Sequence, residues 1–343
     1  MKRLKLTITE IAKLAGVSKS TVSKIINNYD DIGAETRGKV LKIMEEYGYR
    51  PTYSAQSLAK KVSNVIGVIH AGKINSDLNH PFFTEVLNAF KKVIGVEGFD
   101  LLFFSNERFN PNGEDYLARC RHYNVDGCLI IAGGEIEPSI KKLDESDIPC
   151  IGVDLELTGE HSAYIMTDNE QISTLVVDYL YLEGHREVAF IGGLPSSPIS
   201  EMRADAFERG MTACGLTIRP EWMKHGDFFE QSGYERMTEL LQEKDIPKAI
   251  FAVSDLMALG AIKAIRDHGY NINDFAIVGC DDILAARYSD PPLTTVKQDK
   301  EKIGHMAAMM LKDMIKDHGK PGAVKVAPEL VIRSSSRIKK INS

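Results

Sequence analysis

Apolar residues recur at helical spacing near the start of the chain and predict two short amphipathic helices joined by a sharp turn, within TITEIAKLAGVSKSTVSKIIN at residues 7–27. Thr7 and Glu10 have the spacing of a capping box, so the first helix should begin at about Ile8. Gly16 can adopt the left-handed conformation that ends a helix, and Ser18 can cap a second helix over residues 19–27. The expected buried faces are Ile8, Ile11, Ala12 and Ala15 in the first helix and Val22, Ile25 and Ile26 in the second.

Two helices joined by so short a turn cross steeply, in the arrangement that places the second helix in a DNA groove. The outward side chains of the second helix are all hydrogen-bonding types, which suit base edges and phosphates. They are Lys19, Ser20, Ser23, Lys24 and Asn27. A small polar-faced helical hairpin without any DNA contact is the alternative interpretation.

The distribution of charge favours the DNA interpretation. Residues 1–61 contain twelve Lys and Arg against six Asp and Glu, a net charge of +6, whereas the whole chain carries −6. The remainder of the chain therefore carries −12. A compact basic head on an acidic protein is typical of phosphate contacts that are confined to one module.

A third helix is predicted from about Ala34 to Tyr47, with Gly48 as its stop. Its expected core stripe is Val40, Leu41, Met44 and Tyr47. Pro51 then breaks the chain, and residues 54–60 could form a short helix with Leu58 exposed. Because isolated helices below about 12 residues are marginal in water, this segment should be ordered only when something holds it.

These segments resemble the headpiece of the lactose-repressor (LacI/GalR) family. AGVSKSTVSKIIN, TRGKVLKIMEEYGYRP and AQSLA stand where that family has its helix-turn-helix, third helix and hinge helix, although Thr52 replaces the usual asparagine after the proline. The resemblance implies that two hinge segments fold together on DNA and insert a pair of Leu58 side chains into the minor groove as a kinking wedge. A linker leucine packed on its own body is the alternative for Leu58. The predicted DNA contacts are Thr7, Lys19, Ser20, Thr21, Ser23, Lys24, Asn27, Arg37, Tyr53, Ala55, Leu58 and Lys61.

Beyond residue 62, short apolar runs such as VIGVI (65–69), CLIIA (128–132) and FAIVGC (275–280) alternate with amphipathic stretches. Buried strands separated by crossover helices predict doubly wound parallel sheets. About 280 residues are too many for one such core, so two lobes are expected, with a ligand cleft where the carboxyl ends of their strands face each other.

The family resemblance extends to PELVIRSSS at 328–336 and implies a two-lobed, periplasmic-binding-protein-like α/β core behind an all-α helix-turn-helix headpiece. The predicted boundaries are a headpiece at 1–51, a hinge helix or linker at 52–62 and an effector-binding and dimerisation core at 63–343. Within the core, one lobe should contain about 63–165 and 296–324, and the other about 166–292 and 325–343. The chain would cross between the lobes near 163–168, 289–296 and 322–328.

Several polar and aromatic residues follow predicted strands and match the family's pocket positions. The candidate effector contacts are Phe82, Phe83, Asp154, Arg203, Phe228, Ser254, Asp281 and Gln298. Carboxylates and a guanidinium can bond vicinal hydroxyls, and aromatic faces stack on a sugar ring, so this set suits a polyol.

Each of these candidates has a simpler interpretation. The two phenylalanines at 82 and 83 could belong to the core, and Arg203 could form a surface or interlobe salt bridge. Asp168 and Asn169 favour a helix cap over a ligand contact. Ser254 is shorter than the asparagine of many sugar-binding relatives, and Asp282 follows the same strand as Asp281.

No enzyme motif is present: GxSxG, GxxxxGKS and HExxH are missing, and no histidine pair stands at metal spacing with a cysteine. We therefore expect no catalysis, no cofactor and no metal site. The five cysteines lack a CxxC and are interpreted as reduced core residues: Cys120, Cys128, Cys150, Cys214 and Cys280. The absence of a signal peptide and of an apolar run of about 18 residues favours a cytoplasmic protein without a membrane contact.

The leading hypothesis is a transcriptional repressor that binds pseudo-palindromic double-stranded operator DNA as a homodimer. Its small-molecule effector, most plausibly a sugar or sugar phosphate, would bind between the lobes. A purine-type corepressor and a protein partner docking on the core are alternatives. An enzyme or transport receptor on the same fold is disfavoured because catalytic groups and an export signal are missing.

Overall fold

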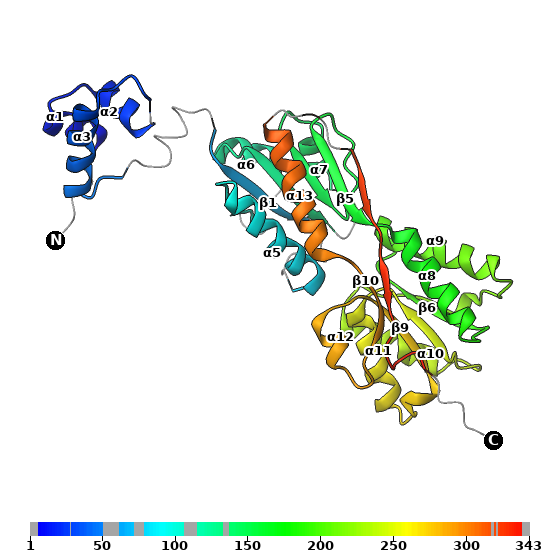
Figure 1. Ribbon diagram of the computed structural model, residues 1–343. Coiled ribbons are helices and arrows are strands. Elements are labelled where there is room, and N and C mark those ends of the chain that lie inside the picture. The colour runs from blue at the N-terminus through cyan, green and yellow to red at the C-terminus, as the bar shows by residue number, and fades with distance from the viewer. Residues whose placement is uncertain are drawn as a thin grey trace. The chain divides into compact units, whose positions relative to one another are not determined.

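The computed structural model describes residues 6–27, 29–50, 62–71, 79–105, 115–132, 137–316, 319 and 322–337. The chain divides into two compact units, Met1–Asn64 and Val65–Ser343, here called the headpiece and the core unit (Figure 1). Among the described residues, no helix is long and apolar enough to cross a membrane.

The headpiece contains three helices, α1 (Ile8–Ala15), α2 (Lys19–Ile26) and α3 (Ala34–Glu46). The predicted caps are confirmed. The Thr7 hydroxyl accepts from the Glu10 N–H while the Glu10 carboxylate accepts from the Thr7 N–H, which completes the capping box. Gly16 ends α1 with a φ of 68°, and Ser18 caps α2 by accepting from the Thr21 N–H at 3.0 Å.

The buried side chains of α1 and α2 match the predicted faces, whereas α3 differs in part. Val40 is fully buried and Met44 packs against the headpiece core, but Leu41 and Tyr47 are 46% and 50% exposed. Leu41 lies one residue, or about 100°, around the helix from Val40, and Tyr47 is already the C-cap beyond the last helical residue. Ile43 and Tyr49 occupy the positions against the core instead.

The core unit consists of two lobes, each built on a six-stranded sheet. The N-lobe sheet has the order β11-β5-β4-β3-β1-β2 and is parallel throughout. Its strands are β1 (Val65–Ala71), β2 (Asp100–Phe103), β3 (Gly127–Ala132), β4 (Cys150–Val153), β5 (Ser162–Thr167) and β11 (Val324–Val326). Its helices are α5 (Pro81–Val96), α6 (Tyr116–Tyr123), α7 (Pro138–Asp144) and α13 (Lys300–Ile315), of which α5 and α13 pack side by side (Figure 1).

The C-lobe sheet has the order β12-β10-β9-β8-β6-β7 and is parallel except where β12 runs antiparallel to β10. Its strands are β6 (Val188–Gly192), β7 (Met223–His225), β8 (Ala249–Ala252), β9 (Ala276–Asp281), β10 (Thr294–Lys297) and β12 (Glu329–Val331). Its helices are α8 (Asn169–Leu182), α9 (Pro198–Ala213), α10 (Glu230–Leu241), α11 (Asp255–Asp267) and α12 (Leu284–Tyr288), with short 3-10 turns at Pro220–Trp222 and Ile272–Asp274. The predicted fold class, a helical headpiece with a two-lobed parallel α/β core, is confirmed.

The chain crosses between the lobes after β5, after β10 and between β11 and β12. The first and third points lie within the ranges predicted for the crossings, 163–168 and 322–328, and the second lies just after the predicted 289–296. Lys297 still pairs with Asp281 in the C-lobe sheet, and Val326 still pairs with Thr167 in the N-lobe sheet. Backbone pairing therefore extends each strand up to the crossing, beyond the end of its apolar run.

Strands β4, β6, β8 and β9 are buried along their whole length, as expected for parallel strands with helices on both faces. Cys120, Cys128, Cys150 and Cys280 are buried within this apolar core, Cys214 is partly buried, and all five are free thiols. Helices α10 and α11 approach each other so closely at Gly233 that a Cβ on this residue would lie 2.2 Å from the Met257 carbonyl oxygen. Glycine is required at that contact.

We expect Gly233→Ala to lower the free energy of unfolding by about 1–3 kcal/mol, because the added methyl group overpacks a backbone contact. Chemical denaturation measures the change. Gly95→Ala is the matched control, since Gly95 is exposed near the end of α5 and its Cβ would meet nothing within 4 Å. Equal stability of the two variants would contradict this account of the α10–α11 contact.

Candidate ligand pocket and nucleic-acid interface

The predicted DNA-contacting side chains on the outward face of α2 differ in whether they already bond other residues of the headpiece. Lys19 and Ser20 are exposed at the start of the helix, where a recognition helix meets base edges. Lys24 is also exposed but forms an ion pair with Asp31. Exposed ion pairs contribute only about 0–1 kcal/mol, so this lysine can exchange its partner for a phosphate at little cost.

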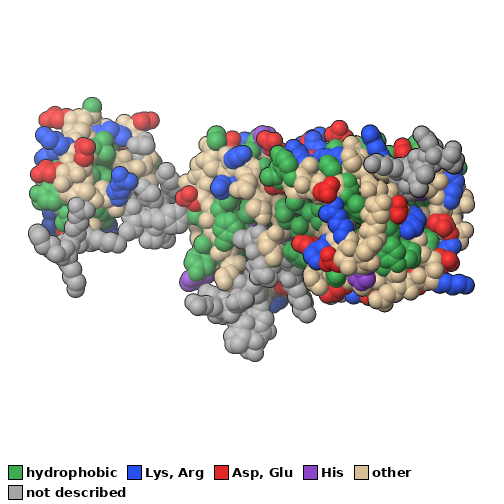
Figure 2. Space-filling view, turned by 90° about the horizontal axis from the view of Figure 1, so that it is seen from below, with side chains coloured by type: hydrophobic (Ala, Val, Ile, Leu, Met, Phe, Trp, Pro, Cys, Tyr) green, Lys and Arg blue, Asp and Glu red, His purple; other side chains and the backbone are tan. Residues whose placement is uncertain are grey.

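The remaining predicted contacts of the headpiece are partly engaged within it. Thr21 bonds the capping Ser18 hydroxyl at 2.8 Å, and the Asn27 amide donates to the Ser23 carbonyl at 2.9 Å. Arg37 donates to the Tyr29 carbonyl, and Thr7 belongs to the capping box. Tyr53, Ala55, Leu58 and Lys61 lie outside the described residues. On the core unit, acidic and basic side chains are interspersed over the face in Figure 2.

A pocket lies within the core unit and is lined from both lobes. Seven of the eight predicted effector residues line it: Phe82, Phe83, Asp154, Arg203, Phe228, Asp281 and Gln298. Three further lining residues were missed by sequence reasoning: His80, Ser197 and Ile199. His80 and Ser197 are the N-caps of α5 and α9, each before a proline, and that shared helix-start pattern is the signal that could have identified them.

Ser254 is the predicted residue that the structure does not bring to the pocket wall. Its hydroxyl accepts from the Met257 N–H at 3.1 Å as the cap of α11 and donates to the Phe228 carbonyl at 2.8 Å. Phe228 has a φ of 75°, in the left-handed region, and its ring packs over Gly193, where a Cβ would lie 2.1 Å from the ring. Ser254 is thus better described as a positioning residue for Phe228, because its short side chain is used up by these two bonds.

Phe82 and Phe83 combine the two roles that the sequence left open. Both are buried in the N-lobe core cluster, and their rings meet edge to face at 5.0 Å. Both also line the pocket. They therefore provide an apolar wall whose position is fixed by core packing.

Arg203 is a buried cation that is held by hydrogen bonds and forms no ion pair among the described residues. It is 3% exposed, its Nε donates to Asn169 Oδ1 at 2.8 Å, and its Nη1 donates to the Val253 carbonyl at 2.7 Å. Nη2 remains as the nitrogen that can meet a ligand. Asp168 caps α8 as expected, whereas Asn169 orients this guanidinium.

Asp281 ends β9 in a backbone conformation that L-residues rarely adopt. Its φ is 125°, and that of Asp282 is 51°. Asp281 Oδ1 accepts from Gln298 Nε2 at 2.6 Å. Lys300 Nζ donates to the carbonyls of Asp281 and Asp282 at 2.8 and 3.1 Å and lies 3.2 Å from the Glu85 carboxylate. The Lys300 ammonium thus joins the pocket loop of the C-lobe to helix α5 of the N-lobe.

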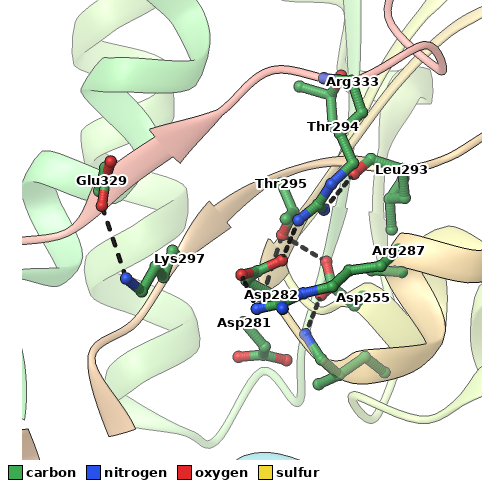
Figure 3. Close-up of polar contacts among 12 residues, drawn as sticks. Asp255, Asp281, Asp282, Arg287, Leu293, Thr294, Thr295, Lys297, Glu329 and Arg333 are labelled. Atoms are coloured by element: carbon green, nitrogen blue, oxygen red, sulfur yellow. Dashed lines mark hydrogen bonds and ion pairs between the residues drawn. The ribbon is translucent and has the colours of Figure 1, made fainter.

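Asp282 is not among the residues that line the pocket, and its carboxylate lies between Arg287 and Arg333 (Figure 3). Its carboxylate pairs with Arg287 at 3.0 Å and with Arg333, whose Nη1 also donates to the Leu293 carbonyl at 2.7 Å. Burial opposes ionisation of Asp282, but hydrogen bonds from Arg333 and Arg287 outweigh it, so its pKa is lowered. Asp282 therefore holds the loop, and Asp281 faces the pocket.

Asp255, the first residue of α11, supports the same loop through hydrogen bonds. Its Oδ2 accepts from the Ile283 N–H at 2.9 Å, and its Oδ1 accepts from the Thr295 hydroxyl at 2.5 Å (Figure 3). Burial, together with the nearby Asp281 charge, raises the pKa of Asp255 to about 8. Burial likewise raises the pKa of Asp154 to about 6, so Asp154 is still largely ionised at pH 7.

Two families match this chain by sequence. Residues 7–52 match the family described as bacterial regulatory proteins, lacI family, and residues 177–336 match the periplasmic binding protein-like domain. The HTH-type transcriptional repressor PurR of Histophilus somni (strain 129Pt) is 33% identical over 96% of this chain and 98% of its own length. That of Pasteurella multocida (strain Pm70) is 32% identical over the same shares.

Solved structures also resemble this chain over nearly its whole length. The lac repressor dimer bound to operator and the anti-inducer ONPF has a TM-score of 0.84 and 26% identity, covering 97% of this chain and 100% of that one. The complex of the transcriptional regulator CelR with cellobiose has a TM-score of 0.73 and 27% identity, covering 96% and 99%.

The raised pKa of Asp255 gives a pH-dependent stability with a defined sign. Between the ordinary aspartate pKa of about 4 and its folded value of about 8, the folded protein keeps a proton that the unfolded chain has released. Folding stability therefore falls as pH rises through this window, by at most about 1.4 kcal/mol per pH unit from this group. We expect the stability of Asp255→Asn relative to the wild type to increase from pH 5 to pH 8, measured by urea denaturation.

Asp267→Asn is the control for this measurement, because Asp267 lies on the same helix but is exposed and has a lowered pKa owing to its hydrogen bond with Lys263. That variant should show no such gain. Parallel stability curves for Asp255→Asn and the wild type would refute the assigned protonation of Asp255.

Proposed function

This chain belongs to the lacI family of bacterial regulatory proteins, and we propose on that basis that the pocket between its lobes holds a small-molecule effector which sets its affinity for operator DNA. The protein is a DNA-binding transcriptional repressor of this family. The single observation that carries effector control is the pocket itself, where charged and polar side chains of both lobes converge on one apolar-walled space. A bound molecule there contacts both lobes at once.

Effector control requires that the ligand bind two states of the protein with different affinity. N-lobe residues His80 and Asp154 and C-lobe residues Arg203 and Asp281 face the same space, so a bridging ligand favours the lobe arrangement in which it meets both sets. The free energy of that preference is the coupling available to the headpiece. Its sign, induction or corepression, follows from which arrangement binds operator.

A carbohydrate is the proposed effector class. Phe82, Phe83 and Phe228 offer aromatic faces, and Asp154, Arg203 and Asp281 offer partners for hydroxyl groups. The structurally similar regulator CelR has been solved with cellobiose. A purine-type corepressor remains a second candidate because the curated relatives are PurR repressors and the same aromatic walls can stack on a base.

We propose a homodimer that reads a pseudo-palindromic operator, as one small headpiece buries too little surface for tight binding and the lac repressor was solved as an operator-bound dimer. The proposed location is the cytoplasm, where such DNA is reached, and the proposed activity involves no catalysis, in keeping with relatives that are transcriptional regulators. Leu58 is retained as the proposed minor-groove wedge.

Replacing Lys19 and Ser20 together by alanine should change the preferred operator half-site in a selection from random DNA, since these exposed side chains start the recognition helix. Lys42→Ala is the control, because Lys42 is a similarly exposed basic residue on α3. It should weaken binding of all sequences slightly and leave the consensus unchanged. An unaltered consensus in the double variant would refute the assignment.

Asp281→Asn should weaken effector binding by about 2–4 kcal/mol, because a buried charged acceptor is lost while its neighbours stay in place. Isothermal calorimetry with cellobiose, glucose, glucose 6-phosphate and hypoxanthine identifies a binder and measures the change. Asp205→Asn, at an exposed site on α9, is the matched control and should bind as the wild type does. If no small molecule binds saturably or alters operator affinity, the result favours the alternative, in which a protein partner docking on the core controls the repressor.

A further inference from the structure

Six polar atoms that face the pocket are buried and have no hydrogen-bond partner among the described residues. They are His80 Nδ1 and Nε2, Asp154 Oδ1, Ser197 Oγ, Asp281 Oδ2 and Gln298 Oε1. All five side chains are more than nine-tenths buried. Since buried polar groups in proteins are normally paired, this cluster indicates the hydrogen-bonding pattern of the molecule that the pocket binds.

Three of the six atoms can only accept hydrogen bonds. Asp154 and Asp281 contribute carboxylate oxygens, and the orientation of the Gln298 amide is fixed because its Nε2 already donates to Asp281 at 2.6 Å. A complementary ligand must therefore present at least three donors. Several hydroxyl groups on one small ring meet this requirement, whereas the oxygens of a phosphate monoester at neutral pH are acceptors.

The cations near the pocket are largely committed to the protein. Lys300 is shared between two carbonyls and Glu85, and two of the three guanidinium nitrogens of Arg203 bond Asn169 and Val253. One nitrogen of Arg203 is left against the carboxylates of Asp154 and Asp281.

The N-termini of two helices also contribute to the charge at the pocket. Helices α5 and α9 begin at the pocket, and each N-terminus contributes about half a positive charge. Both have proline among their first residues, which removes an N–H that an anion could use. Among the described residues, the fixed charges at the pocket therefore nearly cancel, and a phosphate with a charge of about −1.5 to −2 would meet no cation there whose charge is not already balanced.

His80 is the N-lobe residue best placed to bond a hydroxyl. Its ring meets the Phe229 ring of the C-lobe edge to face at 5.5 Å and lies 5.7 Å from the Phe83 ring, so its position is fixed from both lobes. Burial lowers the pKa of His80. The Asp281 carboxylate and the Phe228 backbone, which approaches the ring as a hydrogen-bond partner, oppose this shift, whereas the cations of Arg203 and Lys300 add to it. A neutral imidazole has one donor and one acceptor, as a hydroxyl does.

We infer that His80 is a specificity-determining residue, that it bonds a hydroxyl of an uncharged, hydroxyl-rich ligand from the N-lobe, and that the pocket excludes the phosphorylated form of that ligand. This inference rests on the proposed effector function and narrows it, because sugars and sugar phosphates are no longer equivalent candidates. It also separates polyols from hypoxanthine, whose N–H donors are too few for the three acceptors.

The test uses the full chain and a small-molecule extract of bacterial cells, split by ion exchange into anionic, neutral and cationic fractions. Compounds retained with the protein on ultrafiltration are identified by mass spectrometry. We expect retention of a polyol from the neutral fraction. Its phosphate ester, titrated by calorimetry, should bind at least about tenfold more weakly, a difference of about 1.4 kcal/mol.

The variants isolate the role of His80. His80→Phe keeps a ring against Phe229 but removes both nitrogens, and should lose at least about tenfold in affinity for the retained polyol. His80→Asn restores one donor and one acceptor and should recover part of the loss. His305→Phe, at an exposed site on α13, is the matched control. Far-ultraviolet circular dichroism and thermal unfolding of all three variants, compared with the wild type, verify that each variant is folded.

Each other outcome overturns a defined part of the account. Retention from the anionic or cationic fraction, or retention of a nucleobase, refutes the inference and leaves effector control standing. Retention from none of the fractions refutes the proposed effector function itself, and the inference with it. Wild-type affinity in His80→Phe refutes the role of His80 alone.

Discussion

The ion pair between Asp282 and Arg333 is the constraint on which the pocket depends. Asp281 and Asp282 are consecutive residues with positive φ, a conformation that costs about 1–3 kcal/mol for each and persists only when its surroundings enforce it. Arg333 and Arg287 hold the Asp282 carboxylate, and Lys300 holds the two carbonyls. The loop therefore directs Asp281 toward the pocket while Asp282 anchors the loop.

This anchorage also connects the pocket to the path of the chain between the lobes. Arg333 follows β12 directly after the third crossing, and Lys300 opens α13 directly after the second. Asp281 is thus linked by direct contacts to two of the three crossings, through Lys300 on its carbonyl and through its neighbour Asp282, which pairs with Arg333. On the N-lobe side of the pocket, the ring of His80 packs against Phe229 of the C-lobe. A ligand between these groups can bias the lobe arrangement because both sides are rigidly supported.

The sequence predicted local features well, but it predicted the positions of individual side chains in the fold less accurately. Capping pairs, the glycine stop and the apolar strands depend on neighbours within a few residues, and these were confirmed. Leu41 was wrongly placed in the core because a stripe read from spacing does not say which side of the helix meets its partners. Ser254 was placed in the pocket from its position after a strand, yet its hydroxyl is used to cap α11 and to hold Phe228.

By itself, the sequence determined a basic helix-turn-helix unit and a two-lobed α/β core, because periodicity, caps and charge are properties of short stretches of chain. Only the tertiary structure decided that His80 and Ser197 face the pocket, that the pKa of Asp255 is raised and that Asp282 bonds Arg333, 51 residues away. These outcomes depend on burial and on partners brought together by folding. Desolvation and pairing depend on which groups lie close together in space, and the spacing of residues along the chain does not reveal this.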